Sequence, residues 1–155
     1  MGNSLRILVA AGASFAAGVI GFFFVDPHGS WYTALREPPL MPPDWVFALA
    51  WIALYPLMAL ALMIVWTKKP QDSETSGWVR FYFVQLLFNV GWTIFFFGLQ
   101  TPFIAFIDML FLGFTILCLF TAGEEIYRRV VYLLAPYLAW IGFAAYLNFG
   151  IWYIN

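Results

Sequence analysis

Three tryptophans lie far from the ends of the apolar segments that contain them. If each segment is a helix that crosses a membrane, depth can be counted at 1.5 Å per residue from its outer end, and the basis for calling that end outer is given below. On this count Trp51 and Trp92 lie about 9 and 10 Å deep, and Trp140 about 20 Å deep. A buried indole needs an acceptor for its N–H group, and its face can stack on a flat apolar molecule. These side chains therefore predict either hydrogen bonds between helices or the wall of a small-molecule pocket.

Few polar side chains lie at similar depth. On the same count Asn89, Asn148 and Asp108 lie about 15, 7 and 9 Å deep. Polar groups are costly inside a membrane, so their gathering on the outer side indicates a functional site. An aromatic wall with a few polar groups is typical of a ligand pocket. Hydrogen bonding between helices without any ligand is the alternative, and the residues alone leave both open.

Three other residues could carry chemistry on their own. Asp108 could be the proton or ion site of a coupled transporter, but it has no intramembrane Lys, Arg or His partner, which favours a structural role. His28, the single histidine, could ligate haem axially, although a lone loop histidine is usually solvated. Cys118 is interpreted as a small apolar filler. We expect no metal site and no nucleophile–base pair.

The composition is that of a membrane protein. Of the 155 residues, 64% are apolar and only 10% are charged, against about 25% charged in a typical soluble domain. The length predicts one domain, residues 1–155. The net charge of −1 gives no reason to expect nucleic acid as a partner, whereas the lipid bilayer is an obvious one.

Five apolar segments are long enough to cross a bilayer, which takes about 20 residues of helix. Backbone polar groups in lipid must be bonded internally, so the sequence predicts an all-α, five-helix transmembrane bundle. The expected helices are residues 5–25, 45–66, 79–99, 102–122 and 131–153. A proline-rich outer loop (26–44), a polar loop (67–78), a tight turn (100–102) and a charged loop (123–130) should connect them.

Basic residues predict the orientation. Cytoplasmic loops carry an excess of Lys and Arg. With five spans, six basic residues fall on the side of the N-terminus and only Arg36 on the other. We therefore expect the N-terminus inside and the C-terminus outside. The six residues are Arg6, Lys68, Lys69, Arg80, Arg128 and Arg129.

Other patterns predict packing. Small residues four apart in the first helix (Ala10, Ser14, Gly18 and Ala13, Ala17, Gly21) favour close approach inside the bundle, with a dimer face as the alternative. Four prolines predict that the outer loop is a semi-rigid cap. Five tryptophans near the expected membrane edges are typical of an interfacial belt, namely Trp31, Trp45, Trp66, Trp78 and Trp152.

Several short motifs occur in a specific order. They are Trp31-Tyr32 with Leu35, Pro38 and Pro42-Pro43; Ala50-Trp51 with Leu54-Tyr55; Gln85-Leu86, Phe88-Asn89, Trp92 and Phe96-Phe97-Gly98; Asp108; and Pro136-Tyr137-Leu138-Ala139-Trp140, Phe143-Ala144 and Leu147-Asn148. Together they make the chain resemble, along essentially its whole length, the translocator protein / tryptophan-rich sensory protein (TspO/MBR) family.

This resemblance implies a membrane receptor or translocator, often a homodimer, that binds flat apolar ligands between its helices beneath the first loop. Porphyrins and haem are typical ligands, and sterols and drug-like compounds bind some members. Asn89 would offer a polar handle. Carried over by motif, the pocket walls would be Phe47, Trp51, Tyr55, Asn89, Trp92, Trp140, Ala144 and Leu147.

The resemblance also leaves alternatives. Some bacterial members degrade protoporphyrin oxidatively in light, and Trp51 and Trp140 match the tryptophans implicated there, so a porphyrin-degrading enzyme is the second hypothesis and the Asp108 transporter the third.

Two departures from the family pattern matter. Leu40 stands where the family usually has a loop Trp, and Phe149 replaces the Tyr of a sterol-associated pattern that Lys or Arg should follow. Members occur in bacterial and organelle membranes, and we expect a bacterial envelope.

Overall fold

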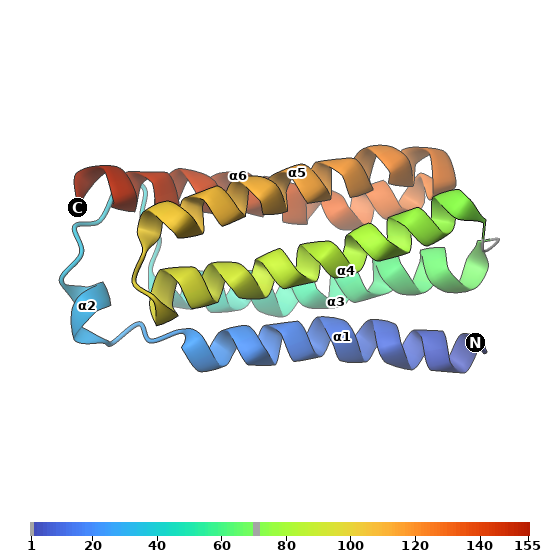
Figure 1. The fold of residues 1–155 in the computed structure, drawn as a ribbon, viewed down its shortest axis with the longest axis horizontal. Helices are drawn as coiled ribbons and strands as arrows, with labels where there is room; N and C mark the ends of the chain where they lie inside the picture. Colours follow the sequence, from blue (N-terminus) through green and yellow to red (C-terminus); the bar gives the residue numbers. More distant parts are fainter. Residues whose placement is uncertain (1, 70–71) are drawn as a thin grey trace.

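The computed structural model describes residues 2–69 and 72–155, so positions 70 and 71 of the expected polar loop lie outside the described residues. Five long helices run side by side (Figure 1). They are α1 (Asn3–Phe24), α3 (Asp44–Lys68), α4 (Ser73–Thr93) with its π-helical continuation η1 (Ile94–Gly98), α5 (Pro102–Tyr127) and α6 (Arg129–Ile154). A short helix, α2 (Ser30–Thr33), interrupts the first loop.

The lengths of the long helices match a bilayer. Each has 22 to 26 residues, which corresponds to about 33 to 39 Å, slightly more than the roughly 30 Å of a hydrocarbon core. All five are apolar enough to span it. The predicted all-α, five-helix membrane bundle is therefore confirmed, and the chain is a multi-pass integral membrane protein.

The helices extend further than predicted at the end that carries the N-terminus. The expected charged loop at 123–130 is wrong, because only Arg128 separates α5 from α6. Helix α4 begins at Ser73, where the Asp72 side chain caps it by accepting a hydrogen bond from the Thr75 N–H at 2.8 Å. This bond also holds the pKa of Asp72 below its usual value. The apolar segment marks only the part of a helix that lies in lipid. The helix itself extends further, because its backbone hydrogen bonds also form where the chain is in water.

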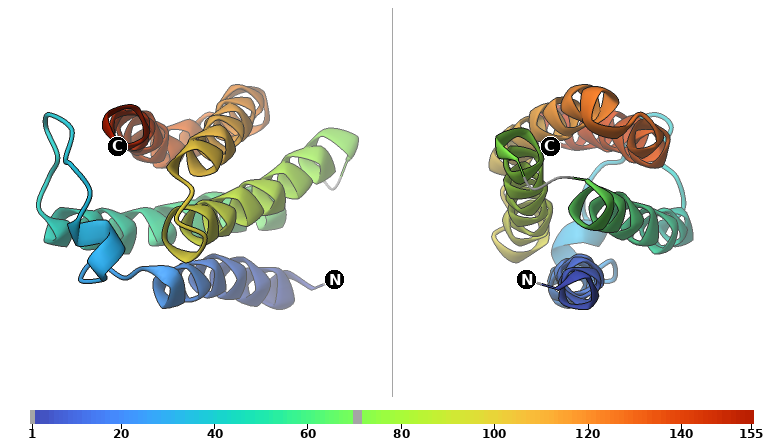
Figure 2. Two further views of the ribbon diagram at one scale, coloured as in Figure 1. Left: turned by 60° about the vertical axis from the view of Figure 1, so that its left-hand side comes forward. Right: turned by 90° about the vertical axis from the view of Figure 1, so that its right-hand side faces the viewer.

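Small residues let α1 lie close to its neighbours. An end-on view shows α1 on one side of the bundle, next to α3 and α4 (Figure 2). Ala10, Ser14, Ala17 and Gly21 are buried there. A Cβ added to Gly18 would lie only 2.9 Å from the Tyr55 ring. These four positions and Gly18 are thus used inside the bundle, as expected.

The first loop is attached to α6 at the end opposite the N-terminus, called the outer end below. The side chain of Asn155 accepts a hydrogen bond from the Arg36 N–H at 2.8 Å and donates one to the Arg36 carbonyl at 3.1 Å. The Tyr146 hydroxyl donates to the Pro39 carbonyl at 3.0 Å. The loop therefore has the fixed attachment of a cap.

Leu40 lies at the tip of this cap in a left-handed conformation, with φ of 66°. The Met41 N–H donates to the Pro38 carbonyl at 3.3 Å, so residues 38–41 form a turn with a positive φ at its third position, as in a type II turn. The Leu40 side chain is 78% exposed. It therefore points away from the bundle and gives the cap no stacking surface above the helices.

We expect that Gly150→Ala loosens the cap. A Cβ at Gly150 would lie 2.6 Å from the Pro38 Cβ, whereas Gly142, in the same helix, has nothing within 4 Å. Both changes should favour α6 by about 1 kcal/mol through helix propensity, so a comparison of the two isolates the contact with the cap. Limited proteolysis should cut the 36–43 loop faster in Gly150→Ala and at the wild-type rate in Gly142→Ala. Equal rates in both variants would contradict the docking of the loop on α6.

Candidate functional site

Aromatic residues of α3 and α6 meet in the outer half of the bundle. Phe47, Trp51 and Tyr55 are four residues apart and share one face of α3. Phe47 packs edge-on against Trp140 of α6, with ring centroids 5.7 Å apart, and Trp51 lies 5.3 Å from Tyr55. Trp51 also contacts the ring of Tyr137, 6.3 Å away. Phe47, Trp51, Tyr55 and Trp140 are called the aromatic cluster below.

The indole of Trp140 carries an unused donor. Its Nε1 is buried and has no hydrogen-bond partner among the described residues. Such a donor costs about 1–3 kcal/mol relative to a bonded one. Of the two interpretations left open for the deep indoles, a hydrogen bond between helices therefore does not apply to Trp140. Its N–H remains available to an acceptor on a bound molecule.

Asn89 lies behind the cluster, and both halves of its amide are already bonded. Its Oδ1 accepts from the Tyr55 hydroxyl at 2.7 Å, and its Nδ2 donates to the Tyr137 hydroxyl at 3.0 Å. Tyr137 in turn donates to Gln85 Oε1 at 2.9 Å. Asn89 thus fixes Tyr55 and Tyr137 in place. Asn89 is only 4% exposed, so a ligand would have to displace neighbouring side chains to reach its second N–H or the second lone pair of its oxygen.

Trp92 belongs to a neighbouring group beneath the cap. Its Nε1 donates to Asn148 Oδ1 at 2.8 Å, and Asn148 Nδ2 donates to the Pro102 carbonyl at 2.7 Å. Asn148, one of the three candidate polar groups at similar depth, is therefore the acceptor for this indole. The Trp92 ring stacks on Phe96, which also receives the edge of Trp31 from the cap.

The remaining predicted wall residues, Ala144 and Leu147, are buried on α6, and Ala144 lies in the main core against which Trp51, Trp92 and Trp140 pack. None of the eight predicted wall residues lines either of two cavities, one of about 270 Å³ at the outer end and one of about 320 Å³ between α4 and α5 at the other end. Within the aromatic cluster, Phe47 instead contacts Trp140, and Trp51 contacts Tyr55. A flat ligand would have to separate Phe47 from Trp140 in order to enter.

Two further residues, Asp108 and Trp78, are buried between helices. Asp108 is buried between α5 and α4, where a Cβ on Gly91 would lie 2.9 Å from its Oδ1, and its Oδ2 has no partner within the described part of the chain. Trp78, expected in the membrane-edge belt, is only 3% exposed and donates to the Leu119 carbonyl. The belt assignment is wrong for Trp78. Distance along a helix gives depth but does not give the face on which a residue lies.

The hydrogen bonds of Tyr55 and Tyr137 were not predicted from the sequence. Gln85 and Asn89, four residues apart, present two amides on one face of α4. That spacing was a usable signal, because buried amides need partners and hydroxyls are the common ones in apolar helices. The partners Tyr55 and Tyr137 could not be identified from it, since their choice depends on how α3 and α6 are rotated.

Five membrane-spanning helices, a docked outer loop and an intramembrane aromatic cluster define a class of compact helical membrane proteins. The chain belongs to the TspO/MBR family, whose model matches residues 8–153. It is 35% identical to the tryptophan-rich protein TspO of Chlorobaculum tepidum, over 97% of this chain and 96% of that protein. It is also 35% identical to the tryptophan-rich protein TspO of Archaeoglobus fulgidus, over 99% of each chain, and 34% identical to the translocator protein of Ovis aries, over 89% of this chain and 83% of the relative.

Proposed function

We propose that the protein is a membrane receptor or translocator that binds porphyrins, haem or related flat apolar ligands at the aromatic cluster. The observation that carries this proposal is the buried N–H of Trp140, which has no partner among the described residues and belongs to an indole packed against the ring of Phe47. A tetrapyrrole has a flat apolar face for the rings and acceptor atoms for the indole. The names of the relatives, translocator protein and tryptophan-rich sensory protein, are consistent with a carrier or receptor role.

Binding requires the cluster to open. The rings of Phe47 and Trp140 are in edge contact, so the ligand replaces one aromatic contact with a larger one. The hydrogen bond from Tyr55 to Asn89 ties α3 to α4. The aromatic cluster therefore opens on its other side, between α3 and α6. In this mechanism Trp51 and Trp140 form the walls, Ala144 and Leu147 the floor, and Trp92 the support beneath the cap.

A titration of the detergent-purified protein with protoporphyrin IX, followed by tryptophan fluorescence in the dark, tests the proposal. We expect saturable quenching, weakened in Trp51→Phe. Trp45→Phe and Trp152→Phe are matched controls, because these exposed tryptophans lie on the same two helices and should not alter the affinity. Quenching that never saturates, or that changes equally in all variants, would mean nonspecific partitioning and would refute the proposal.

The same samples distinguish binding from chemistry. If the protein is a light-dependent porphyrin-degrading enzyme, illumination should consume protoporphyrin in excess over protein, and both Trp51→Phe and Trp140→Phe should stop this turnover. Binding in the dark with no turnover in light is the result that our proposal predicts. For the Asp108 transporter, the test is Asp108→Asn in reconstituted vesicles, where unaltered transport would exclude it.

We propose further that the N-terminus lies inside a bacterial envelope and the C-terminus outside, and that the protein forms a homodimer. The start of α1, the end of α3, the start of α4 and the α5–α6 connection lie at one end of the bundle, which gathers the basic residues there (Figure 1). Alkaline phosphatase fused after Asn155 should be active, and an inactive fusion would reverse the topology.

Sterols stay possible ligands, to be tested by competition with protoporphyrin.

A further inference from the structure

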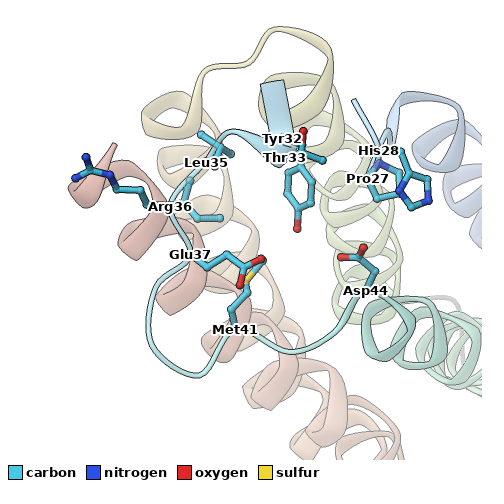
Figure 3. Close-up of a pocket in the computed structure, with 10 residues that line it drawn as sticks. Pro27, His28, Tyr32, Thr33, Leu35, Arg36, Glu37, Met41 and Asp44 are labelled. Carbon is cyan, nitrogen blue, oxygen red and sulfur yellow. The ribbon is translucent and has the colours of Figure 1, made fainter. Parts of the chain in front are cut away.

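The cavity at the outer end lies between the cap and the first turn of α3 (Figure 3). Its volume is about 270 Å³. Leu35, Met41 and Ile151 contribute apolar walls. None of the residues of the aromatic cluster takes part, so this cavity is a separate feature of the molecule.

Negative charge and a phenol face this cavity. The carboxylates of Glu37 and Asp44 and the hydroxyl of Tyr32 turn toward the same hollow (Figure 3). Burial raises the pKa of Tyr32 to about 12, with a further contribution from Asp44 and Glu37. The guanidinium of Arg36 points away from the hollow, so it does not neutralise these acids there.

Size and lining restrict the occupant. Pockets for drug-sized ligands measure roughly 300–1,000 Å³, so this cavity accommodates a head group or a small ion but no tetrapyrrole. Two carboxylates favour a cation, and the oxygen of the Tyr32 hydroxyl is a further acceptor that faces the same hollow. Apolar walls favour an organic cation over a metal ion, which keeps its water.

We propose that this cavity binds a small substituted ammonium ion between the carboxylates of Glu37 and Asp44. The site is distinct from the proposed tetrapyrrole pocket and does not depend on it. An ammonium ion free in solution suits the cavity better than a phospholipid head group, because the phosphate of the lipid would be repelled by the same two carboxylates.

The test is a ligand-observed NMR titration with choline, in a maltoside detergent that has no ammonium group, at low salt. The matched neutral probe is 3,3-dimethylbutan-1-ol, which has the shape of choline without its charge. We expect saturable binding of choline, at least about fivefold weaker binding in Glu37→Gln and in Asp44→Asn, and weaker binding of the neutral probe and of phosphocholine. Added salt should weaken choline binding.

Two controls make the outcome decisive. Asp26→Asn removes an acid from the same loop but outside the cavity lining, and Trp140→Phe alters only the aromatic cluster. Both should bind choline within about twofold of wild type. An equal loss in Asp26→Asn would mean a general surface potential and would overturn the site. Four other results would also overturn the site. They are binding of the neutral probe as tight as that of choline, displacement of choline by calcium at a concentration lower than that of choline, tighter binding of phosphocholine than of choline, and no saturable binding of choline.

Discussion

Trp140→Phe is expected to weaken protoporphyrin binding about tenfold while leaving the unliganded protein as stable as before. Phe retains the edge contact with Phe47 but lacks the N–H and the second ring of the indole. A hydrogen bond contributes about 0.5–1.5 kcal/mol and an aromatic contact a similar amount. Their sum is near the 1.4 kcal/mol that corresponds to a tenfold change in affinity.

The unliganded protein should not suffer from this change, for a specific reason. The Trp140 Nε1 has no partner in the described bundle, so Phe removes a buried donor that is already unpaired. We expect this gain to offset the packing that the core loses with the second ring of the indole. Affinity and stability should therefore separate, which is the signature of a side chain kept for a ligand. A parallel loss of stability and affinity would instead make Trp140 a packing residue, and the pocket would lose its main support.

Asn89→Leu is expected to destabilise the bundle by about 2 kcal/mol. Asn89 is buried and joins Tyr55 to Tyr137. Its loss leaves the Tyr55 hydroxyl without an acceptor inside an apolar bundle. An unpaired buried group costs about 1–3 kcal/mol. Hydrogen bonds between membrane helices have measured values of about 0.6–2 kcal/mol. The expected loss of about 2 kcal/mol lies where these two ranges overlap. The free energy of unfolding in mixed micelles, measured by SDS titration and circular dichroism, gives the value.

A double mutant provides the control for this hydrogen bond. Tyr55→Phe removes the hydroxyl that Asn89→Leu leaves unpaired. Replacing both partners by apolar groups can be nearly neutral, so the double mutant should be more stable than Asn89→Leu alone. If the two losses simply add, the bond between Tyr55 and Asn89 does not contribute in the way that the structure suggests.

The sequence predicted the spans. Apolar length is read directly along the chain, which is why the five helices and the turn before Pro102 were predictable. Depth also made Asn148 one of three candidate partners for the deep indoles, but it could not assign Asn148 to Trp92. The inner helix ends could not be read in this way, because Glu124 and Glu125 are helical although they lie beyond the apolar segment.

Rotation about the helix axes was the part that the sequence left open. Trp78 was placed at a lipid interface, yet its face of α4 turns toward α5. Asn89 was one of the candidate partners for an indole and a predicted handle for a ligand, and in the structure it bonds two tyrosines. The outer cavity also escaped prediction, because it depends on a loop whose path is set by contacts with Asn155 and Gly150 at the far end of the chain.

The most direct test of the central claim is an experimental structure of the protein with protoporphyrin IX bound. We predict density for the macrocycle between α3 and α6, with one face against Trp51, an acceptor atom within hydrogen-bond distance of Trp140 Nε1, and the Phe47 and Trp140 rings separated. Density on the lipid-facing surface, or an aromatic cluster that stays closed in a saturated sample, would contradict the assignment of this cluster as the ligand site.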